Sequence, residues 1–342
     1  DSIGAVVHGL PSGIKIDMDV LNTFVSRRKP NQNKYTTKRN EKDDFEILSG
    51  YFEGHTTGTP LAIEIKNENM KSKDYKDISD NLRPSHADYT GYLRYKGYND
   101  YRGGGHFSGR LTAPLCVVGG IAVQILEKLD IFVCSHISSL YNIVDTPIHL
   151  ESLAAQQYLT KKEVPFFDDE NIDKAKILLD KIIHEKDSVG GIVEIMVHNM
   201  KEGLGSPFFD SLESRISHMI FSIPSVKGLE FGSGFESAML KGSQNNDEFE
   251  IVNDKIRTKT NNDGGINGGI SNGMPIVMKV AVKPTPSIAR EQNTVNIRTM
   301  KDTKQEIKGR HDPAIILRIP PVLESAVAIT ILDVILEEKP QL

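Results

Sequence analysis

The sequence predicts an α+β or layered α/β fold built from two similar halves, and three pairs of matching segments support this prediction. The first pair opens the halves: residues 1–4 (DSIG) and 187–190 (DSVG) each begin an apolar, strand-like run. After the first run come a Gly/Pro turn and an amphipathic helix, with Leu21, Phe24 and Val25 on one face.

The other two pairs keep the same order along the chain. Residues 45–50 (FEILSG) and 235–242 (FESAMLKG) each predict a strand that ends at a glycine. A Gly-Arg pair at 109 and again at 309 precedes a long apolar segment, and these segments predict helices over about 112–129 and 321–337.

Length and composition are those of a globular protein. The 342 residues are about twice a typical domain of ~150 residues, and we expect one domain over 1–342 with pseudo-repeat halves of about 1–150 and 187–342. A pI near 6.1 argues against non-specific nucleic-acid binding. The longest apolar run is broken by Gly119, Gly120, Lys128 and Asp130, so no membrane span is expected.

Two cysteines, Cys116 and Cys134, lie in apolar segments without the spacing of a metal site. We therefore expect reduced, buried thiols, no metal centre and a cytoplasmic location.

Residues 83–110 combine two histidines, four arginines and a triple glycine. Lys and Arg outnumber Asp and Glu in this stretch, although the whole chain has a formal net charge of -5. Such a concentration of cations is typical of a site for a phosphorylated or carboxylated ligand.

Further segments suit an anion. Six basic residues and no acidic one lie between 27 and 39, although this segment taken alone is better explained as a solvated basic loop. Residues 262–273 (NDGGINGGISNG) bring glycine backbone N–H groups within reach of a ligand, but they lack the dinucleotide and P-loop spacings. Segments 283–287 (KPTPS) and 309–313 (GRHDP) place a cation on a proline-stiffened turn.

Six of these motifs occur in the order found in chorismate synthases, and the chain resembles that family over its whole length: RPSHADYT, RGGGHFSGR, KGSQNND, GGINGGISNG, KPTPSI and GRHDP. The resemblance implies a layered β-α-β sandwich and a homotetramer. It implies that 5-enolpyruvylshikimate 3-phosphate, a small phosphorylated substrate, loses phosphate and a C6 hydrogen in a 1,4-anti elimination that yields chorismate. It also implies reduced FMN as cofactor, with NADPH as its reductant in some members.

Position in the family motifs assigns the site residues. The catalytic candidates are His86, which would exchange a proton with the flavin, and Asp312, which would receive a proton at flavin N5. The substrate-binding candidates are Arg28, Lys34, Arg83, Arg110 and Arg310. The flavin-binding candidates are His106, Phe107, Ser108, Pro224, Ser225, Gly268, Lys283, Pro284, Thr285, Pro286, Ser287 and Arg310.

Two departures from the family pattern leave alternatives open. His106 stands where most members have arginine. Members also carry a GESHG segment, whose histidine is thought to protonate the leaving phosphate, just ahead of the residue that matches Asp1. We expect the given chain to be part of a longer protein that contains this segment. The alternatives are an NADPH-dependent flavin reductase and a catalytically impaired flavin- or anion-binding protein that lacks this histidine.

Some residues have simpler interpretations. Asp312 could form a turn before Pro313, and His86 could be a core or helix-start histidine. The tyrosines at 89, 92, 95, 98 and 101 are more typical of packing or of a subunit contact than of base stacking.

Overall fold

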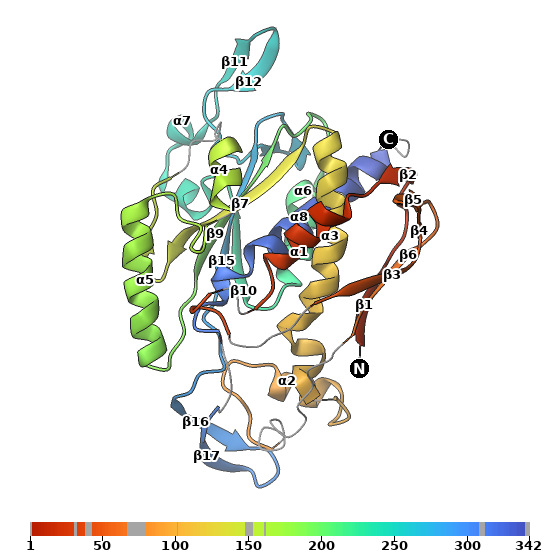
Figure 1. Ribbon diagram of the computed structural model, residues 1–342. Helices are drawn as coiled ribbons and strands as arrows, with labels where there is room; N and C mark the ends of the chain where they lie inside the picture. The colour runs from red at the N-terminus through yellow and green to blue at the C-terminus, as the bar shows by residue number, and fades with distance from the viewer. Residues whose placement is uncertain are drawn as a thin grey trace.

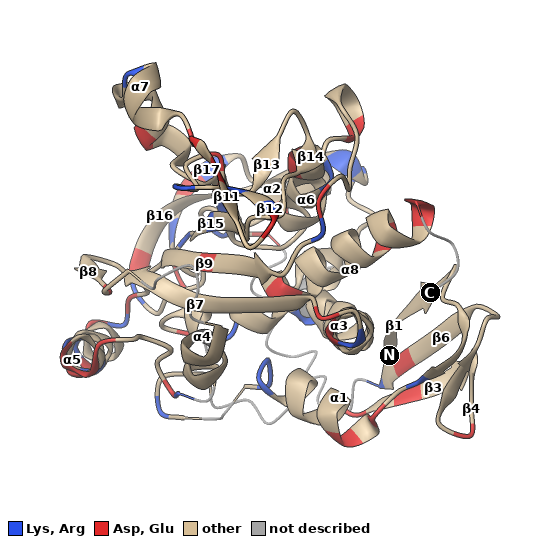
Figure 2. Cartoon of the chain, turned by 90° about the horizontal axis from the view of Figure 1, so that it is seen from above, with Lys and Arg blue, Asp and Glu red and all other residues tan. Residues whose placement is uncertain are grey.

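The computed structural model describes residues 2–30, 33–37, 43–66, 80–100, 102–147, 153–160, 162–307 and 312–338, and of residues 102–104 and 156 it describes the backbone only. Two antiparallel sheets lie on either side of a pair of long helices, α3 (Thr112–Lys128) and α8 (Pro320–Glu338) (Figures 1 and 2). The helix α3 packs on the smaller sheet and α8 on the larger one, while the two helices pack on each other. This arrangement confirms the predicted α+β layered fold.

The smaller sheet has the order β1-β6-β3, from β1 (Ser2–Val7), β3 (Phe45–Ser49) and β6 (Leu61–Lys66). Alternate residues of the central strand, Leu61, Ile63 and Ile65, are buried, as the period of a strand with one core face requires. A second small sheet joins β2 (Ser12–Lys15), β5 (His55–Thr57) and β4 (Tyr51–Phe52). Helix α1 (Met18–Ser26), capped by Asp17, buries Leu21 and Val25 as predicted.

The larger sheet has the order β10-β15-β9-β7-β8. Its core-facing residues include Val193, Ile195 and Val197, which alternate along the central strand. Its strands are β7 (Phe132–Leu140), β8 (Ile143–Val144), β9 (Gly191–His198), β10 (Val226–Phe231) and β15 (Ile276–Val282). The helices beside this half are α4 (Leu153–Leu159), α5 (Asp169–His184) and α6 (Leu212–Phe221).

The two halves share one topology. The first half runs β1, α1, β3, β6, α3, and the second runs β9, α6, β10, β15, α8; in both sheets the last strand of the three lies between the other two. The predicted strand at 235–242 is wrong, because Phe235 lies in a 3₁₀ helix (Gly234–Met239) and the strand equivalent to β3 is β10. The proposed limits of the halves stay a prediction.

The stretch Gly109–Lys128, which contains α3, is long and apolar enough to cross a membrane. The described residues contain one stretch of this kind. This corrects the expectation that no run approaches that length. Of its most apolar 18 residues, 67% are buried inside the protein. The core helix of a globular protein is often equally long and apolar.

Shorter elements surround the two sheets and the helix pair between them. Helix α2 (Asp88–Arg94) and the hairpin of β16 (Glu291–Asn296) and β17 (Lys301–Glu306) lie at the lower end in Figure 1, and the hairpin of β11 (Phe249–Val252) and β12 (Lys255–Thr258) projects at the upper end. The others are 3₁₀ helices at Arg102–Phe107, Gly109–Leu111, Phe208–Asp210 and Ile315–Leu317, α7 (Gly242–Asn245), β13 (Ile266–Asn267) and β14 (Ile270–Ser271).

Candidate active site

A compact cluster of Arg83, His86 and Asp88 precedes and begins α2. The guanidinium of Arg83 donates to both carboxylate oxygens of Asp88, from Nε to Oδ2 at 2.8 Å and from Nη2 to Oδ1 at 2.6 Å. His86 Nδ1 lies 2.8 Å from Asp88 Oδ1 and 3.0 Å from Arg83 Nη2. These side chains are between 11% and 16% exposed, so they form a largely buried but accessible group.

The two neighbours of His86 Nδ1 require opposite hydrogen-bonding roles of this atom. Arginine can only donate, so Nδ1 would have to accept from Arg83 but to donate to Asp88. We assign the Nδ1–H···Asp88 bond, because Arg83 Nη2 already has a shorter bond to the same carboxylate. This tautomer leaves Nε2 as the basic atom that can take up a proton.

The negative charge of the Asp88 carboxylate is stabilised by its hydrogen-bond partners. Burial alone would raise the pKa of this carboxyl group, but the hydrogen bonds from Arg83 and then His86 outweigh burial and hold the pKa well below its usual range. Asp88 therefore stays a carboxylate at neutral pH, and it can stabilise a protonated His86.

Residues 283–287 lie beside this cluster. Lys283 Nζ donates to the carbonyl of Ser85 at 2.8 Å, and its backbone N–H donates to the carbonyl of Ser225 at 2.9 Å. Burial and then the nearby charge of Lys227 lower the pKa of Lys283. The repulsion between Lys283 and Lys227 makes the surroundings of Lys283 favourable for an anion.

A short segment after α5 connects Lys283 with Asp312. The hydroxyl of Ser188 donates to the carbonyl of Thr285 at 2.7 Å, and the next residue, Val189, donates its N–H to the carbonyl of Pro313 at 2.9 Å. The loops that carry the predicted catalytic residues are thus held on the same piece of chain.

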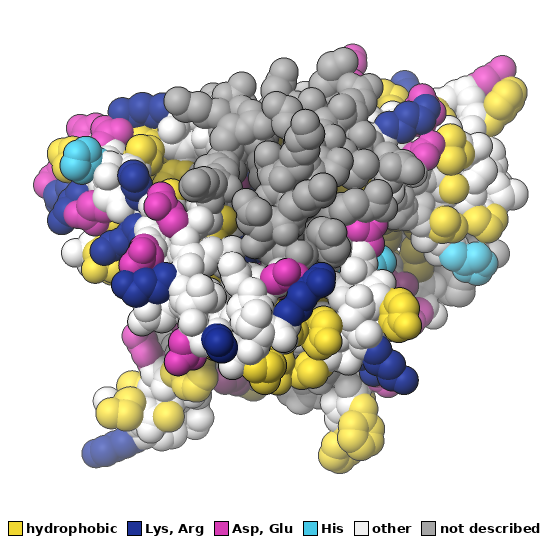
Figure 3. All heavy atoms as spheres, turned by 90° about the horizontal axis from the view of Figure 1, so that it is seen from below, with side chains coloured by type: hydrophobic (Ala, Val, Ile, Leu, Met, Phe, Trp, Pro, Cys, Tyr) yellow, Lys and Arg dark blue, Asp and Glu magenta, His cyan; other side chains and the backbone are white. Residues whose placement is uncertain are grey.

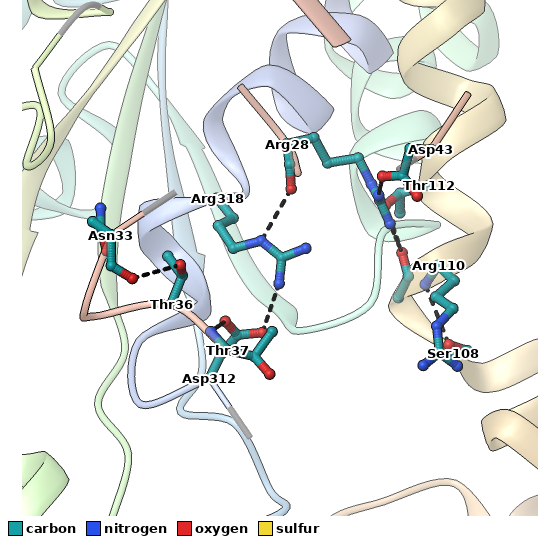
Figure 4. A network of polar contacts seen from close by, with 11 residues as sticks. Arg28, Asn33, Thr36, Thr37, Asp43, Ser108, Arg110, Thr112, Asp312 and Arg318 are labelled. Carbon is teal, nitrogen blue, oxygen red and sulfur yellow. Dashed lines mark hydrogen bonds and ion pairs between the residues drawn. The ribbon is translucent and has the colours of Figure 1, made fainter. Parts of the chain in front are cut away.

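Asp312 is held by two donors (Figure 4). The backbone N–H of Thr37 donates to Oδ1 and Arg318 Nη1 donates to Oδ2, both at 2.8 Å. Arg318 also donates from Nε to the carbonyl of Arg28 at 3.0 Å.

Arg28, predicted to bind substrate, is only 4% exposed. Its guanidinium donates to Thr112 Oγ1 at 2.9 Å, to Asp43 Oδ2 at 2.5 Å and to the carbonyl of Gly109 at 3.0 Å (Figure 4). These bonds fix the start of α3 to the basic loop. A direct contact with substrate would require at least one of them to be exchanged.

Residues 107–110 connect Arg28 back to α2, and so complete a closed circuit of contacts among the segments described above. Phe107 packs on α2: a Cβ on Gly91 would lie 2.5 Å from the Phe107 ring, and the Tyr95 ring lies against it in a tilted arrangement, with 6.4 Å between ring centroids. Ser108 Oγ accepts the backbone N–H of Arg110, next to the Gly109 carbonyl that binds Arg28. Contacts therefore link the described parts of segments 83–91, 107–112, 28–37, 312–318, 188–189 and 283–285 in one closed circuit.

Four predicted residues are placed differently or lie outside the description. Lys34 is exposed and its amine binds Asp180 of α5 at 2.9 Å. Gly268 lies in the β13–β14 hairpin. This hairpin contacts Gly205 and the start of α6 rather than the circuit. His106 is exposed. Arg310 lies outside the described residues.

The remaining predicted flavin-binding residues flank Ser225 and Thr285. Pro224 is exposed, and Ser225 has a positive φ of 80°, a conformation that residues other than glycine adopt at a cost. Pro284, Pro286 and Ser287 continue the proline-stiffened segment, and Ser287 is buried.

Sequence reasoning missed Arg318, Asp43 and Thr112. The signal for Arg318 was an arginine inside an apolar run, IILRIPP, where a cation needs a buried partner. Asp43 and Thr112 gave no signal of this kind, because their role depends on contacts with distant Arg28.

The residues around 285 fit the phosphate of a flavin. Thr285 Oγ1 is buried and has no hydrogen-bond partner among the residues described, a costly state that a ligand acceptor would relieve. Lys283 lies two residues before it and Ser225 is bonded to Lys283. The described residues contain no cluster of His, Cys, Asp and Glu suited to a metal ion.

The surface at the lower end of the molecule in Figure 1 is mixed in character. In the space-filling view from below, exposed apolar side chains lie among charged ones (Figure 3). Helix α2, at this end, exposes Tyr89, Tyr92, Leu93 and Tyr95, so the described tyrosines of this stripe lie at the surface rather than in the core.

The fold and the site together define a layered α+β protein in which cations gather around a hydrogen-bonded histidine–carboxylate pair. Comparisons with known proteins agree. A model of the family described as "Chorismate synthase" matches residues 1–336. The chorismate synthase of Korarchaeum cryptofilum (strain OPF8) is 42% identical over 331 residues, covering 97% of this chain and 91% of the relative. That of Pyrococcus abyssi (strain GE5 / Orsay) is 43% identical over 332 residues, with the same two coverages.

A solved structure titled "Crystal Structure of Chorismate Synthase" superposes with a TM-score of 0.76 at 26% identity, covering 99% of this chain and 92% of that one. The chain belongs to the chorismate synthase family, and the resemblance found in the sequence is confirmed. It is accordingly a lyase.

Proposed function

We propose that this lyase converts 5-enolpyruvylshikimate 3-phosphate into chorismate and inorganic phosphate by a 1,4-anti elimination that requires reduced FMN. The observation that carries the proposal is the circuit of contacts that links the segments of Arg83, His86, Lys283 and Asp312. In the reaction a C6–H bond and the C–O bond to phosphate break, and a conjugated diene replaces one double bond. The reaction has no net oxidation.

The residues divide the work by charge. The substrate carries two carboxylates and a phosphate, and the cations Arg83 and Arg110 supply fixed positive charge for them. His86 Nε2 holds or releases a proton, while Asp88 stabilises the charged ring. Asp312, fixed by Thr37 and Arg318, accepts a proton.

Lys283, Thr285 and Ser225 would hold the phosphate end of FMN. When bound, reduced FMN supplies electron density to the allylic system of the substrate, which is chemistry that protein side chains lack.

An anaerobic assay tests this proposal. The purified protein is mixed with 5-enolpyruvylshikimate 3-phosphate and either photoreduced FMN, oxidised FMN or no flavin, and phosphate and chorismate are measured. We expect stoichiometric phosphate and chorismate with reduced FMN alone. Equal rates without flavin would refute the cofactor assignment, and NADPH oxidation with FMN but no chorismate would identify the flavin reductase instead.

We also propose that the subunits form a homotetramer. In support, the β11–β12 hairpin exposes Phe249, Ile251 and Ile256, which the strand register places on one face. Sedimentation velocity of the wild-type protein and of a Phe249→Glu/Ile251→Glu variant tests this: a wild-type monomer would refute it.

A cytoplasmic location completes the proposal. Its support is that both cysteines are free and buried, as the sequence predicted, and burial raises the pKa of Cys116 to about 11 and of Cys134 to about 12. Protonated, buried thiols suit a reducing compartment. Fluorescence microscopy of a tagged full-length protein tests the location.

A further inference from the structure

Arg318 joins two parts of the site that are far apart in sequence. Its guanidinium donates to the Asp312 carboxylate at 2.8 Å and to the carbonyl of Arg28 at 3.0 Å. Arg318 and Asp312 are 11% and 12% exposed, so their bond is largely shielded from water. The Arg28 side chain in turn binds Asp43, Thr112 and the Gly109 carbonyl at the start of α3.

These contacts give Arg318 a geometric task. A carboxylate on a loop can rotate about its side-chain torsions, and Asp312 has one further bond, from the Thr37 backbone. A planar guanidinium that holds Asp312 with one nitrogen and the Arg28 carbonyl with another removes this freedom. It also fixes the distance between Asp312 and the basic loop.

We propose that Arg318 is a positioning residue that orients the Asp312 carboxylate for proton transfer and fixes it relative to residues 28–37. The inference rests on the proposed function of Asp312. Misplacement of a reacting group by about 1 Å can cost roughly 10²-fold in rate, so the effect belongs in kcat rather than in KM.

The test uses four variants of the full chain: Arg318→Met, Arg318→Lys, Asp312→Asn and the Arg318→Met/Asp312→Asn double variant. Arg215→Met is the matched control, because Arg215 also bridges two acceptors, Asp333 and Glu337, at the surface of α8. Anaerobic kcat and KM with reduced FMN are measured, together with hydrogen–deuterium exchange of residues 33–37 in the flavin-free protein.

For Arg318→Met we expect kcat to fall about 10- to 100-fold, with KM changed less than about threefold, and faster exchange at 33–37. Arg318→Lys should fall between it and the wild type, since one amine holds the two acceptors less well. The double variant should be no slower than Asp312→Asn alone, because both changes disable the same group. Arg215→Met should leave kcat and exchange unchanged.

Different results separate the possible failures. Wild-type kcat and exchange in Arg318→Met would overturn the inference, as would a double variant whose losses simply add. If Arg318→Met does not fold, full kcat and normal exchange in Arg318→Lys would overturn it equally. A fully active Asp312→Asn variant would instead reject the catalytic role of Asp312, whereas the exchange result would still report whether Arg318 fixes the loop.

Discussion

Gly119 of α3 lies directly against Ser325 of α8: a Cβ on Gly119 would be 2.1 Å from the Ser325 Cβ and 2.5 Å from its Cα. No real Cβ contact is this short, so the two helices cross at a point where only hydrogen fits. Gly120, the next residue, faces Leu21 and Phe24 of α1 in the same way. The closeness of α3 and α8 therefore depends on Gly119, and the packing of α1 on α3 depends on Gly120.

Gly119→Ala should destabilise the protein by at least about 1–3 kcal/mol, because the neighbouring atoms are in a packed helix and cannot move aside cheaply. Gly242→Ala is the control, since no atom lies within 4 Å of a Cβ at that position. Urea unfolding of the two variants gives the comparison. Equal stability of Gly119→Ala and wild type would mean that the helices can separate without cost.

A buried ion pair fixes the end of α1 to α8. Arg27 donates to both oxygens of Glu324, at 2.6 and 2.9 Å, and Ser135 of β7 donates to Glu324 at 2.6 Å. Glu324 is 1% exposed. The desolvation of Arg27 would lower its pKa, but the charge of Glu324 outweighs it and raises that pKa.

Glu324→Ala should therefore destabilise the protein by up to about 3–5 kcal/mol, because it leaves the partly buried Arg27 cation without its partner. An Arg27→Met/Glu324→Met double variant should recover much of that loss, since replacing both charges by apolar groups is often nearly neutral. Chemical unfolding measures both. A double variant less stable than Glu324→Ala would contradict this account.

The sequence predicted the local parts of this molecule better than the distant pairings. The helices at 112–129 and 321–337 were predicted to within about one residue, because each is a long apolar run with a clear start. The strand predicted at 235–242 is wrong, because Phe235 lies in a 3₁₀ helix and is 82% exposed. The prediction depended on this single aromatic residue.

The same limit applies to the site. The motifs around His86 and Lys283 could be found from their residues, but nothing local shows that Lys283 donates to Ser85 or that Arg318 holds both Asp312 and the Arg28 carbonyl. Lys283 and Ser85 are separated by 198 positions and Arg318 and Arg28 by 290, and only the folded topology brings these two pairs together. Burial of Arg28 could not be read from a segment that looked like a solvated basic loop.

Stability should depend on pH through His136 of β7, which is 1% exposed. Burial lowers its pKa to about 4, although Asp145 opposes the shift. Glu194 lies 3.6 Å from Nε2, too far for a good hydrogen bond, so burial dominates. Because the unfolded histidine takes up a proton below about pH 6.5, stability should fall as the pH drops from about 6.5 towards 4.

The His136→Gln variant lacks this titration. Thermal unfolding of both proteins across pH 4 to 7.5 should show a steeper loss for the wild type, amounting to about 3 kcal/mol at most. Parallel curves would show that burial does not lower the pKa of His136 in the folded protein.

Catalysis should depend on the pairing of His86 with Asp88. His86→Ala removes the proposed proton-exchange group and should lower the single-turnover rate by about 10²- to 10⁴-fold with reduced FMN supplied. Asp88→Asn keeps the imidazole but loses the carboxylate that orients Nδ1 and stabilises the charged ring, so its loss should be smaller. His184→Gln, an exposed histidine on α5, is the matched control and should retain the full rate.

Asp88→Asn has a second consequence, which separates structure from chemistry. The pKa of Asp88 is depressed in the folded protein, so its stabilising contribution is full above the unfolded value of about 4 and declines as the pH falls towards the folded value. The stability difference between wild type and Asp88→Asn should therefore be constant near neutral pH and shrink below about pH 4. If His86→Ala and Asp88→Asn both retained the wild-type single-turnover rate while this stability difference was present, the cluster would be a structural brace for α2 and the proton-exchange role would have to move to another residue.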